Sequence, residues 1–512
     1  MHTSTVVSLV SVKQTAQRRH KFVLSRQSTE AAIESSIIKS SIMPPQRSDD
    51  KVINVNVNAK KKASAEGETV VIQPVDEPAY VKCRSKNVFE NPLSPPGCTA
   101  QEVNATLNLN LGLPINPEQK LVRTILRWIN VVGIMWWEDW LFAFIKNLPV
   151  ALRRRVCMTA WHIYFQVHKR LIGRRSGLHP AASEQYHALT SVAYWGRWFP
   201  MTIPRMRFSL SQLSAWTDNH VTSKVDRIQF DMQVSNLHGW SNCVSGLYVH
   251  SGNHNEVATT KSNKVIYWLY GGAYLSGDVD GNLSPAELVG KTCGVDVFLA
   301  SYSLIPEAKF DEIVWDVCLA YHWLVTVKGV DPGDIILYGI SSGAGLATRL
   351  MQMIARHGRG EETFPAELAG IVSPMPRGAV LLCPFVDYTE PDPEGSFLQY
   401  SKHDLIVNQS VLEVGLPFFD IALGDRRREC SPCHGDFEGL PPLCVVVSEH
   451  ETVYDQTLLL VNKARQEGVD VTLGVWKYLC HVFCFLSAYC PEGKQAMAFC
   501  NEWIQQEASK SE

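Results

Sequence analysis

The sequence predicts an α/β protein in which a mostly parallel central sheet is covered by helices on both faces. From about residue 225 onward, short apolar runs of strand length alternate with amphipathic segments of helix length. One junction between such a run and the segment after it carries Gly339-Ile340-Ser341-Ser342-Gly343. Strands that alternate with helices pair in parallel through crossover connections, which place helices on both faces of the sheet.

The expected strands are apolar runs bounded by polar or glycine-containing turns, and they cover 265–270, 295–300, 335–338, 378–383, 443–447 and 471–476. The segments 310–327 and 453–466 lie between strands and have the length and apolar spacing of helices. This spacing gives successive strands the long connections that a parallel sheet requires.

The chain has 512 residues, enough for one large domain with additional segments. Residues 1–116 are rich in Ser, Lys, Asn and Pro and carry no sustained hydrophobic period, so we expect them to be mostly disordered. Residues 117–224 are expected to form a helical, basic and aromatic cap region. Residues 225–508 are expected to form the α/β domain.

The composition excludes two classes of protein. A formal net charge of −3 at pH 7 argues against a general nucleic-acid binder, which carries a strong basic excess. The 14 cysteines show no repeating spacing and are too few for a disulfide scaffold. We therefore expect an intracellular protein, cytoplasmic or peripheral on a membrane.

The first 29 residues carry a possible targeting signal. They contain no acidic residue, and they are basic and rich in Ser and Thr, which resembles an organellar transit peptide. A disordered basic tail, or a translation start assigned upstream of Met43, explains the same composition equally well.

The cap region combines a basic helix with tryptophans. After Pro149, which can begin a helix, apolar residues recur at helical spacing and form one face: Val156, Ala160, Ile163, Val167 and Leu171. No acidic residue lies between Asp139 and Glu184. The basic residues of this stretch are Lys146, Arg153, Arg154, Arg155, Lys169, Arg170, Arg174 and Arg175, and Trp136, Trp137 and Trp140 lie just before or at its start.

Tryptophan beside a basic amphipathic helix is typical of a membrane interface. One interpretation of residues 128–175 is therefore peripheral membrane contact. The other is a helical cap packed on the α/β domain, with its basic side chains in water. No segment reaches the roughly 18 uninterrupted apolar residues of a membrane span, so we expect no transmembrane helix.

Ser341 occupies the position of a nucleophile in the strand–turn–helix motif. Glycines two residues before and two residues after it leave room for a sharp turn, whereas Ser342 is flanked by Ile340 and Ala344 at those positions. An alcohol becomes a useful nucleophile at neutral pH when a base takes its proton and a third group orients that base. In this motif the chain order is serine, acid, histidine.

Candidates for the acid and the base lie downstream of Ser341 in that order. A polar turn after strand 443–447 carries Glu449, Glu451 and then Asp455. His481 follows the last expected strand, where a loop histidine can reach the serine. His450 is the competing histidine, but it precedes the expected acid in the chain.

A glycine pair at the end of strand 265–270 is the candidate oxyanion loop. Acyl transfer places negative charge on the carbonyl oxygen, and backbone N–H groups aimed at that oxygen lower the barrier. Gly271 and Gly272 allow the backbone to approach the oxygen without a clash from a Cβ atom.

Six segments of residues 225–505 resemble, in order, motifs of the hormone-sensitive-lipase-like family of α/β-hydrolases, which includes bacterial carboxylesterases and arylacetamide deacetylases. The segments are Tyr270-Gly271-Gly272-Ala273, Tyr302-Ser303-Leu304-Ile305-Pro306-Glu307, Gly339-Ile340-Ser341-Ser342-Gly343-Ala344, Ser431-Pro432 with Gly439-Leu440-Pro441-Pro442, Glu451-Thr452-Val453-Tyr454-Asp455, and His481-Val482-Phe483. The resemblance implies the α/β-hydrolase fold with an N-terminal helical cap, and chemistry that needs no metal or organic cofactor.

The resemblance also implies a role for each matching residue. Ser341 would be the nucleophile, His481 the general base and then the general acid, and Glu451 the orienting carboxylate. The oxyanion hole would consist of the N–H groups of Gly271, Gly272 and Ser342.

Four residues depart from the family pattern. Tyr270 replaces a histidine beside the oxyanion loop, and Ile340 replaces an aspartate beside the nucleophile. Glu451 replaces an aspartate and Val482 replaces a glycine. None of these changes removes a member of the serine–histidine–carboxylate set, so the resemblance favours activity.

The leading functional interpretation is a serine hydrolase that cleaves carboxylic esters. The aromatic content of the cap region favours hydrophobic acyl, aryl or sterol groups in a small ester substrate. An amidase or deacetylase that acts on aryl amides would share the machinery. A protein of another class, a weakened hydrolase that binds a hydrophobic ligand or a partner without turnover, would explain Tyr270, Ile340 and Val482.

One cysteine motif suggests other chemistry. Cys430-Ser431-Pro432-Cys433-His434 matches the pattern of covalent haem attachment and half of a zinc site. The surrounding residues resemble the Ser-Pro loop of the family, and the sequence has no second cysteine pair at suitable spacing. We therefore expect ordinary loop thiols and no metal.

Overall fold

A computed structural model describes residues 71–72, 81–83, 148–171, 182–196, 203–217, 219–236, 238–252, 264–361, 370–401, 404–408, 411–412, 415–416 and 422–510. The segment 1–29 that resembles a transit peptide lies outside the described residues. So do the tryptophans at 128–140 and, apart from two short strands, the expected disordered region 1–116.

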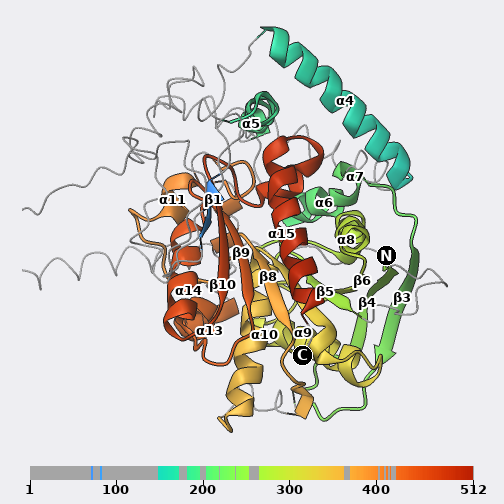
Figure 1. The fold of residues 1–512 in the computed structure, drawn as a ribbon, viewed down its shortest axis with the longest axis vertical. Coiled ribbons are helices and arrows are strands. Elements are labelled where there is room, and N and C mark those ends of the chain that lie inside the picture. Colours follow the sequence, from blue (N-terminus) through green and yellow to red (C-terminus); the bar gives the residue numbers. More distant parts are fainter. Residues whose placement is uncertain are drawn as a thin grey trace, which may run out of the picture. The chain divides into compact units, whose positions relative to one another are not determined.

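The described strands form one ten-stranded sheet in the order β1-β2-β10-β9-β8-β7-β5-β6-β4-β3 (Figure 1). The run from β10 to β6 is parallel, which confirms the predicted fold class. The parallel strands are β5 (Val265–Leu269), β6 (Asp296–Ala300), β7 (Ile335–Ile340), β8 (Gly378–Leu382), β9 (Leu443–Ser448) and β10 (Val471–Trp476). The antiparallel edge strands are β1 (Val71–Ile72) and β2 (Val81–Cys83) on one side, and β3 (Lys224–Asp231) and β4 (Cys243–His250) on the other.

The strand order places a topological switch point beside the predicted nucleophile. The chain passes from β5 outward to β6 and then returns to β7 on the other side of β5. Leu269 at the end of β5 therefore pairs with Gly339 near the end of β7. In open α/β sheets, ligands bind at the carboxyl ends of the strands at such a point. The glycine loop after β5 and the turn after β7 are thus neighbours.

One predicted strand was too short. The strand expected at 335–338 continues to Ile340, because Gly339 and Ile340 pair with Leu381 and Leu382 of β8. A Cβ atom at Gly339 would lie 2.5 Å from the Cα atom of Ala344 in the following helix. Glycine at this position therefore lets the strand run directly into the turn while the helix packs across it.

Helices cover both faces of the sheet. Two neighbouring residues of β5 point to opposite faces and contact different helices. Tyr267 donates its hydroxyl to the Val317 carbonyl of α9 (2.8 Å), whereas Trp268 donates its indole N–H to the Asn282 side chain of α8 (3.3 Å). The covering helices are α8 (Val279–Cys293), α9 (Phe310–Thr326), α10 (Ser342–Gly358), α14 (Tyr454–Gln466) and α15 (Pro491–Ser509). Short helical segments connect the later elements: η3 (Pro332–Asp334), α11 (Ser396–Tyr400), η5 (Gly424–Arg426), α13 (Arg427–Cys430), η6 (Pro432–His434) and η7 (Phe483–Ala488).

The cap region contains four described helices, which are α4 (Val150–Leu171), α5 (Glu184–Gly196), α6 (Ile203–Ser211) and α7 (Leu213–Trp216). Specific polar contacts attach them to the sheet domain. Ser183, just before α5, donates its N–H (2.7 Å) and its hydroxyl (2.9 Å) to the buried carboxylate of Glu492. Arg207 of α6 pairs with both oxygens of Glu307 and donates to the Leu275 carbonyl.

Helix α4 buries a face other than its aliphatic one. Trp161 packs edge-on against Tyr489, Tyr164 donates a hydrogen bond to Ser191, and His168 is buried. The predicted aliphatic face is exposed instead, with Ile163 at 59% and Leu171 at 79%. No helix among the described residues combines the length and the hydropathy needed to cross a bilayer.

A buried carboxylate holds the segment that leads into β3. Glu287 of α8 is fully buried, accepts the N–H groups of Thr222 (2.8 Å) and Ser223 (2.6 Å), and pairs with Lys291 (2.8 Å). Burial alone would raise the pKa of Glu287, but the donors from Lys291, Ser223 and Asn219 outweigh burial and lower this pKa to about 2.

Replacing Glu287 with glutamine is expected to lower the free energy of unfolding by about 2 kcal/mol at pH 7, because the charged acceptor is lost. The folded pKa lies below the ordinary value, so this stabilisation is complete above about pH 4.5 and disappears as the pH falls towards 2. Urea denaturation of the two proteins at pH 7 and pH 3 measures the loss of stability and its dependence on pH. An equal deficit at the two pH values, or a deficit no larger than that of exposed Glu502→Gln, contradicts this role.

Candidate functional site

Ser341 lies at the turn between β7 and α10 in a strained backbone conformation. Its φ and ψ of 52° and −117° are rare for a residue with a side chain. Its N–H donates to the Leu382 carbonyl at the end of β8 (2.8 Å). A Cβ atom at Gly343 would lie 2.2 Å from the Leu269 carbonyl oxygen, so only glycine lets α10 start this close to β5.

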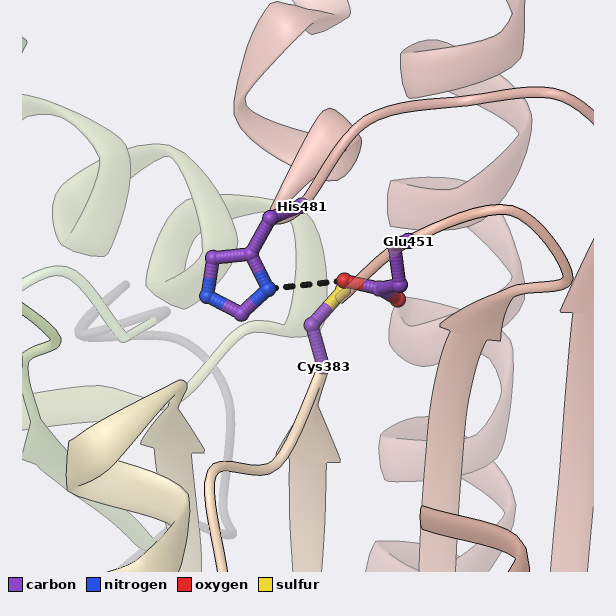
Figure 2. A group of neighbouring side chains, drawn as sticks. All are labelled: Cys383, Glu451 and His481. Atoms are coloured by element: carbon purple, nitrogen blue, oxygen red, sulfur yellow. Dashed lines mark hydrogen bonds and ion pairs between the residues drawn. The ribbon is translucent and has the colours of Figure 1, made fainter. Parts of the chain in front are cut away.

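The structure brings Ser341, His481 and Glu451 together in one hydrogen-bonded line. The Nε2 atom of His481 lies 2.8 Å from the Ser341 Oγ atom. The Nδ1 atom of His481 lies 2.7 Å from Oε2 of Glu451, and Figure 2 shows this second contact. The other carboxylate oxygen accepts the Ser448 N–H (2.7 Å). His481 and Glu451 are buried, and Ser341 is 8% exposed.

The environment of Glu451 has opposing effects on its pKa. Complete burial raises the pKa of Glu451, while the hydrogen bond from His481, the charge of His481 and the Ser448 N–H oppose that rise. A carboxylate that accepts the Nδ1–H of a histidine fixes the tautomer whose Nε2 can take a proton from the serine.

The competing candidates lie elsewhere. The Asp455 carboxylate accepts the Ser396 N–H (2.6 Å), and the His450 ring stacks on Tyr478 at 4.2 Å between centroids. Of the candidates in the polar turn and the loop, Glu451 and His481 are therefore the pair that reaches Ser341.

The glycine loop lies directly against the nucleophile turn. A Cβ atom at Gly271 would lie 2.8 Å from the Ile340 carbonyl oxygen and 3.1 Å from the Ser341 Cβ atom. Gly272 has a φ of 138°, and the next residues, Ala273 and Tyr274, have φ of 54° and 60°. Ser342 is the first residue of α10, where backbone N–H groups have no partner within the helix.

Three comparisons with known proteins bear on the fold and on the kind of activity. Residues 266–485 match a family model described as alpha/beta hydrolase fold. An acetyl-hydrolase of Streptomyces hygroscopicus is 27% identical over 246 residues, which cover 48% of this chain and 76% of that protein. An esterase of Acinetobacter venetianus is 29% identical over 244 residues, 47% of this chain and 74% of that protein.

Among solved structures, an esterase from the bacterial hormone-sensitive lipase family aligns with a TM-score of 0.51 and 25% identity, over 64% of this chain and 99% of its own. These comparisons support a hormone-sensitive-lipase-like α/β-hydrolase. The mostly parallel sheet is that of the α/β-hydrolase fold.

In this hydrolase, Tyr270 stands where the family pattern has histidine. A second tyrosine, Tyr302, holds it in place. The rings of Tyr270 and Tyr302 stack at 4.1 Å with an angle of 13°. The Tyr302 hydroxyl donates to the Tyr270 carbonyl (2.5 Å), and the Tyr270 hydroxyl donates to the Tyr302 carbonyl (3.2 Å). This reciprocal pair holds the start of the glycine loop.

Restoring the family residue by Tyr270→His is therefore expected to lower activity, by about 10-fold in kcat, rather than to improve it. Histidine has a smaller ring to stack on Tyr302 and lacks the hydroxyl that reaches the Tyr302 carbonyl, so the anchor of the loop is weakened. Turnover of p-nitrophenyl butyrate measures the effect, with Tyr270→Phe as the variant that keeps the stack. Higher activity in Tyr270→His than in the unchanged protein contradicts this account.

Two supports of the hydrolase site have no signature in the sequence. Asp404 is buried and its Oδ2 atom accepts the His481 backbone N–H (2.7 Å), while its Oδ1 atom accepts the N–H of Ile406 (2.7 Å). Tyr274 donates its hydroxyl to the Ser342 carbonyl (3.0 Å), which ties the glycine loop to the nucleophile turn. Both contacts join residues far apart in the chain, so no local pattern could have predicted them.

Val482 explains why the family pattern has glycine beside the histidine. Its φ of 53° lies in the left-handed region, which a β-branched residue rarely adopts. The strained turn lies between His481 and η7, and His481 keeps its contact to Ser341.

The cysteine motif forms a packed loop. Cys430 and Cys433 are both buried, each 1% exposed. The hydroxyl of Ser431 between them accepts the Tyr388 N–H (2.7 Å). Covalent haem attachment requires both thiols to face a large open site, which such burial does not provide. Asp387, Cys433 and His434 lie within 4.8 Å of one another, but Cys430 is not part of that group.

Proposed function

We propose that this chain is a serine carboxylesterase that cleaves esters with hydrophobic acyl, aryl or sterol groups. The proposal is supported by the similar proteins named above, which are an acetyl-hydrolase and an esterase. The observation that carries the proposal is the line of two hydrogen bonds, 2.8 Å and 2.7 Å, that joins Ser341, His481 and Glu451.

In the proposed mechanism, His481 takes the Ser341 proton at Nε2 as the Oγ atom attacks the ester carbonyl. The N–H groups of Gly271, Gly272 and Ser342 stabilise the charge on the carbonyl oxygen. His481 then returns the proton to the leaving alcohol, and an acyl group remains on Ser341. A water molecule activated by His481 releases the acid. The ionised Glu451 stabilises the imidazolium in both steps.

Apolar and aromatic groups around Ser341 support a hydrophobic substrate. Phe385 donates its N–H to the Ser341 carbonyl (3.1 Å), and its ring lies 5.2 Å from that of Tyr388. Tyr274 and Phe310 pack edge to face beside them at 5.4 Å. A serine hydrolase that acts on aryl amides would use the same groups, and its preference would depend on the leaving group.

The test is covalent labelling with a fluorescent fluorophosphonate, together with turnover of p-nitrophenyl butyrate. We expect labelling and turnover in the unchanged protein and in Ser342→Ala, and neither in Ser341→Ala. Ser342 is the matched control because it is adjacent and keeps its N–H as alanine. A folded protein that neither labels nor turns over favours the other class, a hydrophobic-ligand-binding protein.

We also propose that α4 contacts anionic membrane surfaces, so that the hydrolase works on membrane-borne esters. The exposed aliphatic face of α4 supports this proposal. Its residues lie on one side of the helix, with exposed fractions of 59% for Val156, 59% for Ile163, 48% for Val167 and 79% for Leu171. The helix has no acidic residue, and Arg170 is exposed beside the aliphatic face. Aliphatic insertion and basic attraction together are typical of interfacial helices.

Flotation with vesicles of zwitterionic lipid, with and without phosphatidylserine, tests this contact. We expect binding to the anionic vesicles, and loss of that binding in Ile163→Glu. His162→Glu is the matched control, because it adds the same acid at the next position on the exposed side away from the aliphatic face. Equal binding by the two variants, or no binding by the unchanged protein, contradicts the proposal.

A further inference from the structure

Cys383, directly after β8, places its sulfur beside the Glu451 carboxylate that His481 also contacts (Figure 2). The N–H of Cys383 donates to the Val446 carbonyl of β9 (2.7 Å). The Sγ atom of Cys383, a Glu451 carboxylate oxygen and a His481 ring nitrogen all lie within 4.8 Å of one another. All three side chains are buried.

The backbone at Cys383 is strained. Its φ of 46° lies in the left-handed region that residues with a side chain seldom adopt. Such strain persists where the surrounding structure holds it, and it concentrates at functional sites. The preceding residue, Leu382, is the one whose carbonyl accepts the Ser341 N–H (2.8 Å), so the end of β8 supports both the nucleophile and the acid.

We propose that Cys383 is a positioning residue whose thiol donates a hydrogen bond to Glu451 and keeps that carboxylate ionised and aimed at His481. This inference rests on the proposed function, since it concerns the acid of the same site. A fully buried carboxylate needs donors on both oxygens to remain charged. His481 and Ser448 supply two, and the thiol supplies a third.

The thiol stays protonated and can therefore serve as a donor. Burial raises the pKa of Cys383 well above its ordinary value, and contact with Cys484 and with the charge of Glu451 raises this pKa further. Cys484 lies on η7, directly after the His481 loop, so the two thiols also connect the end of β8 to that loop.

The groups that face this carboxylate set the sign of the pH effect. The titratable groups around Glu451 are Cys383 at the end of β8, Cys480 and His481 on the loop after β10, and Cys484 on η7, while Asp404 faces the His481 backbone. Loss of a donor makes the carboxylate more basic, so the Glu451–His481 pair gains its proton at higher pH. Activity that needs neutral His481 then begins at higher pH.

The experiment is the pH dependence of the rate of fluorophosphonate labelling. In Cys383→Ala we expect the acid limb, where the labelling rate rises with pH, to move to higher pH by about half a unit. In Cys383→Ser, which carries the stronger hydroxyl donor, we expect the limb to move to lower pH than in the unchanged protein. Cys444→Ala is the matched control, because it removes a buried sulfur from neighbouring β9 whose partner is the Cys500 thiol.

If Cys383→Ala is labelled more slowly at every pH but its acid limb does not shift, the thiol contributes only to packing. That result overturns the inference. If Cys383→Ala does not fold, Cys383→Ser decides alone: the stronger hydroxyl donor must move the limb to lower pH, and an unchanged limb contradicts the proposal. An unchanged protein that is not labelled at any pH refutes the proposed function instead, so the two failures are distinguishable.

Discussion

Replacing Ser341 with either alanine or glycine is expected to reduce kcat by a factor on the order of 10⁵, because the proposed nucleophilic hydroxyl is lost. The two variants should nevertheless differ in stability. The φ of 52° and ψ of −117° strain any residue with a Cβ atom, whereas glycine adopts them readily. Ser341→Gly should therefore exceed Ser341→Ala in free energy of unfolding by about 1 kcal/mol.

Comparison of the two variants isolates the backbone, because both lack the hydrogen bond from Ser341 to His481. Equilibrium denaturation in urea measures the difference. Equal stabilities would mean that the turn relaxes when the serine is removed, and the strain assigned to the nucleophile would be wrong.

The second large effect is expected at Gly272. A Cβ atom there would lie 2.1 Å from the Ser276 carbonyl oxygen, and the φ of 138° is unfavourable for alanine. Gly272→Ala must therefore displace the loop beside Ser341 that we propose as part of the oxyanion hole. We expect kcat for p-nitrophenyl butyrate to fall by about 10²–10³-fold, the usual cost of losing an oxyanion donor.

Gly329→Ala is the control for this variant. Gly329 also has a positive φ, 75°, but no atom lies within 4 Å of its added Cβ atom, and it is remote from the candidate site. Both substitutions carry backbone strain, so only Gly272→Ala should lose kcat. A similar loss in both would assign the effect to general destabilisation.

The sequence alone predicted the parallel sheet and the candidate site residues at the ends of its strands. Apolar runs bounded by turns marked β5 to β10, and the chain order of serine, acid and histidine favoured His481 over His450. The choice of Glu451 among three acids came from the family pattern, and the hydrogen bond of 2.7 Å to His481 agrees with that choice.

The supports of the site could not be predicted, because they depend on contacts between distant parts of the chain. Asp404 meets His481 across 77 residues, and Tyr274 meets Ser342 across 68. Cys383 looks like an ordinary strand residue until the end of β8 is placed beside Glu451. The aliphatic face of α4 was visible at helical spacing, but only the structure indicates that Trp161 and Tyr164 face the domain while Ile163 faces outward.

The most direct test of the central claim is to find the acyl group. The protein would be quenched with acid during turnover of p-nitrophenyl butyrate, digested and mapped by mass spectrometry. The account predicts a butyryl group on the peptide that contains Ser341 and none in Ser341→Ala. Turnover without an acyl group on Ser341, or a butyryl group that persists at another residue in Ser341→Ala, would contradict it.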